Sequence, residues 1–346
     1  MNTLTLFVNI SNECQKKCDH CYSSNSGGKM DRKVVEEVVG WSSGIFKEEK
    51  SKKLKLVLLG GEPLTNMDNC LYMVDLFERY VPEALPPVFD VKYTLATNGD
   101  LITTEVLKEL KSRGIRIALN PSYDSLQDVE NKILKIKEVC KGCALFVCLN
   151  DANLSRATEI AKLAVKHNCF IRINRMYQGS NNSEYIEEYG RKASEMLDVL
   201  LAFPKPAWPN WVIDSVFPLR LNGNKNSYSC GKGLFVVDWD GMLRSCNPDY
   251  DSTIGSIRTH LHLKDFIFPQ KWNAEDLSEC KECSWLNLCQ GGCPYTRKIA
   301  YGIYGRKTPF CEVHKKIWPK LLELTEKWKN SHRELYEKFT YNNVCQ

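Results

Sequence analysis

The stretch LTLFVNISNECQKKCDHC, residues 4–21, decides the fold that this sequence predicts. Its first seven residues are mostly apolar and β-prone, which predicts a buried strand over Leu4–Ile10. Cys14, Cys18 and Cys21 follow at the spacing C-x3-C-x2-C. The chain has 346 residues and sixteen cysteines, and in a chain of this size such a number favours metal binding or catalysis over a disulfide framework. We therefore expect the loop after the first strand to hold a metal group.

Five further apolar, β-rich runs follow, each separated from the next by enough chain for a helix. They are Leu54–Leu59, Phe89–Ala96, Ile115–Leu119, Cys143–Leu149 and Cys169–Asn174. Helical periodicity is clearest at Asp31–Val39, Thr104–Arg113 and residues 153–167. Six strand–helix units predict an α/β fold, a parallel sheet curled into a partial (β/α)6, TIM-like barrel. The chemistry of such a barrel lies in the loops after its strands.

The composition of the chain changes after the predicted barrel, which occupies residues 1–202. Residues 203–229 are rich in Pro, Asn and Trp and are expected to bridge to a second unit. Residues 230–312 combine many cysteines with weak apolar periodicity, which predicts a small domain ordered by metal. Residues 313–346 are expected to form C-terminal helices that break near Pro319 and pack onto the body.

Charge and hydropathy exclude several classes of protein. The net charge is only +5, and no pattern of basic and aromatic residues predicts nucleic-acid binding. No apolar run reaches the length of a membrane span, and the first residues lack the pattern of a signal peptide. The expected protein is therefore cytoplasmic, with neither a nucleic-acid partner nor a membrane partner.

Three closely spaced thiolates suit either zinc with a distant fourth ligand or a four-iron cluster with one open iron. The sequence after the second strand favours the four-iron cluster over zinc, because the turn GGEP occupies Gly60–Pro63. A C-x3-C-x2-C loop after the first strand, followed by this turn after the second, resembles the radical SAM superfamily. The resemblance implies a [4Fe–4S] cluster on Cys14, Cys18 and Cys21. It also implies that the open iron binds S-adenosylmethionine and that its cleavage yields a 5′-deoxyadenosyl radical.

The resemblance also implies contacts to the cofactor at the ends of later strands. The turn Thr97–Gly99 is similar to a family motif, whereas Asn120 departs from the family pattern after the fourth strand and leaves Ser122 as the ribose contact. Arg172 or Arg175 near the sixth strand is a further candidate, and a structural role is open for each of these residues. The cofactor-binding residues expected are Gly60, Gly61, Glu62, Pro63, Asn98, Ser122, Asn150 and Arg172.

Seven later cysteines resemble the SPASM extension of radical SAM enzymes, because their spacings match throughout. The resemblance implies two auxiliary [4Fe–4S] clusters, which makes three clusters in all. The first auxiliary cluster would use Cys230, Cys246 and Cys293, and the second would use Cys280, Cys283, Cys289 and Cys311. Seven thiolates are one fewer than two fully ligated clusters need. We therefore expect an open or non-cysteine position on the first auxiliary cluster, filled by substrate or by a residue such as Asp249.

The family resemblance implies an enzyme that oxidises or cross-links residues of a peptide or protein, as a ribosomal-peptide maturase does. Because the sequence begins at the first barrel strand, a leader-binding protein would be a separate partner, and the expected reductant is of the flavodoxin or ferredoxin type. Asn247 stands where sulfatase maturases carry an aspartate that acts as a base, which leaves Asp249 as the catalytic candidate. The alternatives are a small-molecule radical SAM oxidase, for example of a tetrapyrrole side chain, a non-catalytic iron–sulfur electron carrier and a zinc-binding interaction protein.

Overall fold

The computed structural model describes most of the chain. The described residues are 3–23, 27–49, 53–84, 90–121, 124–140, 142–202, 234–266, 277–289, 291–303 and 305–331. Some predictions lie outside these ranges, namely Ser122 as a cofactor contact, Cys230 as a cluster ligand, the bridging segment 203–229 and the predicted C-terminal tail beyond Ser331.

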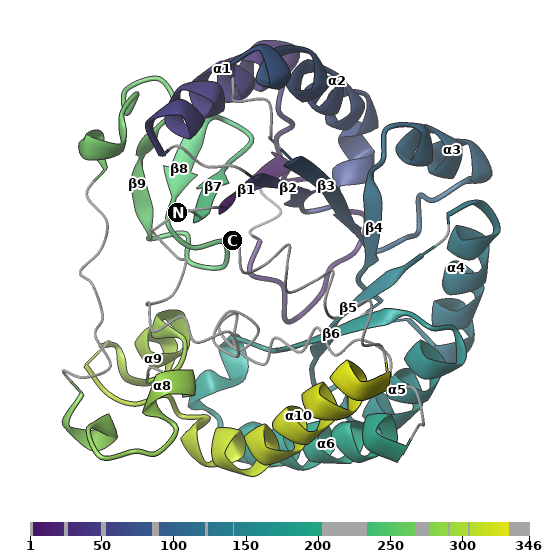
Figure 1. Ribbon diagram of the computed structural model, residues 1–346, viewed down its shortest axis with the longest axis vertical. Coiled ribbons are helices and arrows are strands. Elements are labelled where there is room, and N and C mark those ends of the chain that lie inside the picture. The colour runs from purple at the N-terminus through teal and green to yellow at the C-terminus, as the bar shows by residue number, and fades with distance from the viewer. Residues whose placement is uncertain are drawn as a thin grey trace.

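A sheet of strand order β6-β5-β4-β3-β2-β1-β7-β8-β9 forms the centre of the molecule (Figure 1). Its first six strands in the chain are β1 (Thr3–Ser11), β2 (Lys53–Gly60), β3 (Asp90–Thr97), β4 (Arg116–Leu119), β5 (Ala144–Leu149) and β6 (Phe170–Arg175). Neighbours among these six are all parallel, so their C-terminal ends lie along one edge. The six strands predicted from the sequence are confirmed to within one residue at each end.

Helices cover the outer face of the curved sheet (Figure 1). They are α1 (Arg32–Glu49), α2 (Met67–Ala84), α3 (Thr104–Ser112), α4 (Leu126–Val139), α5 (Ala157–Lys166) and α6 (Ser183–Ala202). Local sequence explains where α3 and α4 start, because the Thr103 and Ser125 side chains accept hydrogen bonds from the first-turn amides. The predicted helix over Asp31–Val39 is correct in place but short, since α1 continues to Glu49. The partial (β/α)6 barrel is thus confirmed.

The cysteine-rich half of the chain begins as an extension of the barrel sheet. β7 (Leu234–Val237) pairs in parallel with β1, and β8 (Met242–Arg244) and β9 (Thr253–Ser256) follow as antiparallel neighbours. Asp238, directly after β7, accepts a 2.6 Å hydrogen bond from Asn9 Nδ2 and two from Arg244, which is almost fully buried. This ion pair joins the C-terminal ends of β7 and β8, and the Asn9 contact attaches both to the C-terminal end of β1.

Helices joined by turns follow in the described residues after β9. They include short helices at Ser278–Cys280 (η6) and Leu286–Cys289 (α8), then α9 (Pro294–Tyr301) and α10 (Cys311–Ser331). Figure 1 shows α10 lying along α6 at the outside of the barrel.

The predicted break near Pro319 is wrong, because α10 runs through Pro319 without interruption. A proline inside a helix removes one backbone hydrogen bond and strains the preceding turn. Trp318, Leu321 and Leu324, which flank Pro319, are buried against the body, and this burial offsets the local cost. The predicted packing of these three side chains onto the body is confirmed.

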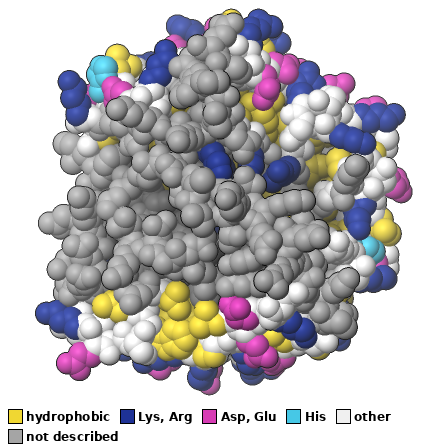
Figure 2. Space-filling view, in the orientation of Figure 1, with side chains coloured by type: hydrophobic (Ala, Val, Ile, Leu, Met, Phe, Trp, Pro, Cys, Tyr) yellow, Lys and Arg dark blue, Asp and Glu magenta, His cyan; other side chains and the backbone are white. Residues whose placement is uncertain are grey.

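The outer surface fits the mild net charge. On the face in Figure 2, most Lys and Arg side chains of the described residues lie around the rim among Asp and Glu side chains, a few lie nearer the middle, and they do not gather in one basic patch of the described surface. Among the described helices, none is long and apolar enough to cross a membrane.

Candidate active site

The loop after β1 brings Cys14, Cys18 and Cys21 to the C-terminal edge of the barrel. All three are partly buried, and all three are free thiols. The Cys21 amide donates to the Cys18 carbonyl at 2.9 Å, which closes a tight turn between these two cysteines. Cys14 Sγ accepts hydrogen bonds from the Lys16 amide at 3.4 Å and from Asn98 Nδ2 at 3.8 Å. Backbone and side-chain hydrogen bonds therefore hold the cysteine loop in a defined conformation.

Burial raises the pKa of each of these thiols above its usual value. The effect is largest at Cys18, where burial and the neighbouring Cys21 and Cys14 raise the pKa to about 11. Metal binding reverses this preference, because a coordinating thiol gives up its proton and the positive charge of the metal stabilises the thiolate. Three free thiols in one loop fit a [4Fe–4S] cluster that keeps one iron open.

The turn after β2 packs directly on the backbone of the cysteine loop. The Gly61 amide donates to the Ser11 carbonyl, and the Glu62 amide donates to the Glu13 carbonyl, both at 2.7 Å. Gly60 has φ +141°, and a Cβ there would lie 2.0 Å from the Ser11 oxygen. The two glycines therefore let the ends of β1 and β2 approach more closely than side chains would permit.

Gly60→Ala is expected to lower the free energy of unfolding by about 3 kcal/mol, because the new methyl group strains the backbone and meets a carbonyl that cannot move away. Urea unfolding of the full chain measures the loss. Gly44→Ala is the matched control, since Gly44 lies in α1 with open space around it and alanine favours the helix by up to about 1 kcal/mol. Equal stability of the two variants would contradict the close approach.

Glu62 connects the turn after β2 to the turn after β3. Its side chain is fully buried and accepts hydrogen bonds from the Leu64 amide at 3.1 Å, Thr97 Oγ1 at 2.8 Å and the Asn98 amide at 2.9 Å. Burial raises the pKa of the Glu62 carboxyl, and the three donors oppose that shift. Asn98 in turn donates to Cys14 Sγ. The carboxylate thus positions the residue that contacts Cys14, one of the cysteines predicted to hold a cluster.

Asn150 and Arg172 lie on the opposite side of the barrel. Asn150 is buried, donates to the Cys148 carbonyl at 3.1 Å and lies 3.2 Å from His20 Nδ1 in the cysteine loop. The Arg172 guanidinium lies over the Phe146 ring at 5.1 Å, and its buried Nε has no hydrogen-bond partner among the residues that the structure describes. A buried guanidinium nitrogen without an acceptor is costly unless a ligand supplies one.

Burial alternates along β6, so that Ile171, Ile173 and Arg175 are buried on one face while Arg172 lies on the other. Arg175 Nη2 lies 3.4 Å from Thr296 Oγ1, which places this arginine against α9. Of the two arginines that the sequence offered, Arg172 is therefore the one on the less buried face of its strand.

Tyr22 and Asn247 join the two cysteine-bearing halves, and the sequence did not single out Tyr22. The Asn247 side-chain amide donates to the Tyr22 hydroxyl, and Tyr22 directly follows Cys21 while Asn247 directly follows Cys246. Burial raises the pKa of the Tyr22 hydroxyl well above its usual range. The only signal in the sequence is the adjacency of each residue to a predicted ligand.

Asp249 is buried and ion-paired. Its Oδ1 accepts from Lys298 Nζ of α9 at 2.8 Å, and Lys298 also contacts Asp251. Tyr295, one turn earlier in α9, has its pKa raised to about 12 by burial, with smaller contributions from Asp249 and Cys246. The structure thus places Asp249 near Cys246, where the sequence predicted a non-cysteine ligand or a base.

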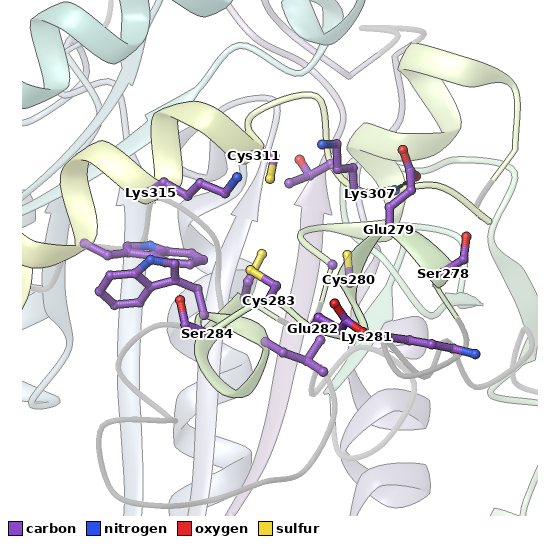
Figure 3. A pocket seen from close by; sticks show the side chains of 16 residues that line it. Ser278, Glu279, Cys280, Lys281, Glu282, Cys283, Ser284, Lys307, Cys311 and Lys315 are labelled. Atoms are coloured by element: carbon purple, nitrogen blue, oxygen red, sulfur yellow. Dashed lines mark hydrogen bonds between the residues drawn. The ribbon is translucent and has the colours of Figure 1, made fainter.

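A second group of thiols lines a cavity of about 580 Å³ in the C-terminal half. Its walls include all four cysteines predicted for the second auxiliary cluster, Cys280, Cys283, Cys289 and Cys311. We call it the thiol cavity. Figure 3 shows the sulfur atoms of Cys280, Cys283 and Cys311 turned toward one another across it. Among the described residues, no three His, Cys, Asp or Glu side chains form a site for a single metal ion.

Two lysines on one side of the thiol cavity partly offset the effect of burial on its thiols. Burial raises the pKa of Cys280 and Cys311, and the ammonium groups of Lys307 and Lys315 oppose this shift at Cys311. Both lysines line the cavity (Figure 3). Four thiols around a space of this size suit a polynuclear group, because a four-iron cluster separates its ligands instead of gathering them at one point.

Comparison with known proteins identifies the class. Residues 8–189 match the model of the radical SAM superfamily, which covers more than half of the chain, so the protein belongs to that superfamily. A cysteine-type anaerobic sulfatase-maturating enzyme of Clostridium perfringens is 22% identical over 92% of this chain and 96% of its own. An Fe-coproporphyrin III synthase of Methanosarcina barkeri is 20% identical over 89% of this chain and 87% of its own.

The fold agrees with a solved structure over nearly the whole chain. The structure of native anSMEcpe with bound AdoMet and Cp18Cys peptide superposes with a TM-score of 0.74 at 19% identity. The match covers 95% of this chain and 99% of that one. The chain therefore has the fold of a SPASM-type radical SAM enzyme, including the part that follows the barrel.

Proposed function

We propose that the protein is a radical SAM maturase that oxidises or cross-links residues of a peptide or protein substrate. The observation that carries this proposal is the joining of the two cysteine loops through Tyr22 and Asn247 at the C-terminal edge of the barrel. Radical chemistry begun at the first loop would therefore take place beside an electron acceptor at the second. The likeness to a structure that holds AdoMet together with a peptide supports this choice of substrate.

In this proposal Cys14, Cys18 and Cys21 hold the reactive cluster, and the turn Gly60–Pro63 with Asn98 forms the wall on which S-adenosylmethionine binds. When bound, the cluster and S-adenosylmethionine supply reductive cleavage of the sulfonium and hydrogen abstraction by the 5′-deoxyadenosyl group. The protein fixes the loop through Glu62 and Asn98, and Arg172 offers its Nε to a carboxylate of the bound cofactor. Ser122 and Asn150 stay predicted cofactor contacts.

We further propose two auxiliary [4Fe–4S] clusters in a SPASM unit of residues 230–312, which follows the barrel of residues 1–202 and precedes the tail of residues 313–346. The second cluster would occupy the thiol cavity, whose four cysteines match its predicted ligand set. The first would use Cys246 and Cys293 with Cys230, and Asp249 stays the candidate for its open position. A flavodoxin- or ferredoxin-type reductant and a cytoplasmic location complete the proposal.

Mass spectrometry of reaction products tests the substrate class. The anaerobically reconstituted protein is incubated with S-adenosylmethionine, dithionite and a library of short cysteine-containing peptides. A loss of two mass units from one peptide, with 5′-deoxyadenosine formed in step, supports a maturase. The second candidate function is oxidation of a small-molecule tetrapyrrole, which the likeness to an Fe-coproporphyrin III synthase supports. Conversion of coproporphyrin substrates with no change in any peptide would overturn the peptide proposal.

Cys283→Ala is expected to remove about four iron atoms per chain, because one of the four thiolates that line the thiol cavity is lost and one four-iron cluster no longer assembles. Iron and sulfide assays of the reconstituted variant measure this loss. Cys140→Ala is the matched control, since Cys140 is a partly buried free thiol at the end of α4. Wild-type iron content in Cys283→Ala would contradict a cluster in the thiol cavity.

A further inference from the structure

His314 is a buried histidine beside the thiol cavity that the proposed reaction does not use. It lies in the first turn of α10, three residues after Cys311, and is 1% exposed. Its Nδ1 lies 4.0 Å from Cys289 Sγ, at the outer limit for a hydrogen bond to sulfur. Cys289 is one of the four cysteines that line the thiol cavity.

Aromatic packing fixes the orientation of this imidazole. The ring stacks on Trp318 with centroids 5.0 Å apart and an interplanar angle of 18°, and on Phe310 with centroids 6.4 Å apart and an angle of 25°. Phe310 is fully buried and Trp318 is nearly so, which leaves no space for the ring to swing away. The position of Nδ1 toward Cys289 is therefore a built feature of the fold.

The chemistry of a bound thiolate decides which partner is the donor. A cysteine that ligates iron has lost its proton and can only accept a hydrogen bond. The imidazole nitrogen that faces it must then carry the hydrogen. Hydrogen bonds to the sulfur atoms of iron–sulfur clusters are one of the factors that set reduction potential, because they stabilise the more negatively charged reduced state.

We propose that His314 is a positioning residue that donates its Nδ1 hydrogen to Cys289 and raises the reduction potential of the second auxiliary cluster. This inference rests on the proposed function, because it requires that cluster to occupy the thiol cavity. A higher potential at this site makes the cluster a better acceptor for an electron released by oxidised substrate. The role is one of tuning, since His314 need not contact substrate or S-adenosylmethionine.

His314→Phe and His314→Gln separate the hydrogen bond from the packing. Phenylalanine keeps an aromatic ring between Phe310 and Trp318 but has no N–H, whereas glutamine keeps an N–H and loses the ring. Both are made in full-length protein that carries Cys14→Ala, Cys18→Ala and Cys21→Ala, so that only auxiliary clusters remain. The midpoint potentials are read by redox titration followed by electron paramagnetic resonance. We expect one midpoint to become more negative in His314→Phe and to return toward the parent value in His314→Gln.

His262→Phe is the control, because His262 is an exposed histidine that pairs with Glu48 away from the thiol cavity, and its midpoints are expected to match the parent. Unchanged midpoints in His314→Phe at parental iron content would overturn the inference. Should His314→Phe fail to load iron, pulsed electron paramagnetic resonance of the parent protein with 15N-labelled histidine decides. Nitrogen coupling to a reduced auxiliary cluster supports the hydrogen bond, and its absence overturns it. Failure of the proposed cluster is distinguishable, since Cys283→Ala would then keep all of its iron.

Discussion

Replacing Cys18 by alanine is expected to lower the formation of 5′-deoxyadenosine by more than about 100-fold, because even the loss of a group that merely orients a metal ligand costs about 10- to 100-fold. Cys18 lies between Cys14 and Cys21 in the loop after β1, and these neighbours contribute to its raised pKa. A cluster with two remaining thiolates does not stay bound at this edge of the barrel. The product is measured by liquid chromatography after anaerobic incubation with S-adenosylmethionine and dithionite.

The fold should survive this substitution, because the Cys18 side chain is only partly buried and the sheet beneath it is complete. Circular dichroism is expected to match that of the wild type, and the auxiliary clusters are expected to keep their iron. Cys70→Ala is the variant with which Cys18→Ala is compared. It also removes one thiol, but Cys70 is fully buried in α2 and lies in the hydrophobic core. Wild-type amounts of 5′-deoxyadenosine from Cys18→Ala would show that the first loop does not hold the reactive cluster.

Glu62→Ala is expected to lower the free energy of unfolding by about 3 kcal/mol or more, because it leaves three donors in the barrel edge without their acceptor. The donors are the Leu64 amide, Thr97 Oγ1 and the Asn98 amide. Asn98 is then free to move away from Cys14 Sγ, so binding of S-adenosylmethionine should weaken as well. Urea unfolding measures the first effect, and equilibrium dialysis with labelled S-adenosylmethionine measures the second.

Two further variants test whether the loss of stability in Glu62→Ala comes from the missing acceptor oxygens. Glu62→Gln keeps one acceptor oxygen and should fall between wild type and Glu62→Ala. Glu138→Ala removes an exposed carboxylate of α4 and should change stability by no more than about 0.5 kcal/mol. If Glu62→Ala were as stable as Glu138→Ala, the carboxylate would not be the group that joins the turns after β2 and β3.

The barrel was predictable because each of its strands is a short apolar run of the kind that parallel sheets bury. Leu54, Leu56 and Leu58 show this pattern on β2, where every second side chain is fully buried. β7, β8 and β9 were missed because they lie outside the repeating strand–helix units that mark β4, although β4 is equally short, and three or four residues show no period by themselves. The break assigned to Pro319 came from a local rule, and burial of the neighbouring side chains overrode it.

At the candidate site, the grouping of the cysteines in the loop after β1 and around the thiol cavity was predictable, because their spacing in the sequence is itself the signal. The contact between Tyr22 and Asn247 was not, since it joins residues 225 positions apart and depends on β7 pairing with β1. The place of Cys289 in the wall of the thiol cavity was predictable, whereas the histidine beside it was not, because only the turn of α10 brings His314 to it. Long-range contacts of this kind follow from the topology of the fold and leave no periodicity.

The central claim is that the loop after β1 starts radical chemistry on S-adenosylmethionine. Quantifying 5′-deoxyadenosine from the anaerobically reconstituted wild-type protein with S-adenosylmethionine and dithionite tests it most directly. The account predicts that 5′-deoxyadenosine forms, that it exceeds the background without protein and that Cys18→Ala reduces it to that background. A protein that carries its full iron and sulfide, is reduced by dithionite and yet forms no 5′-deoxyadenosine would contradict the account.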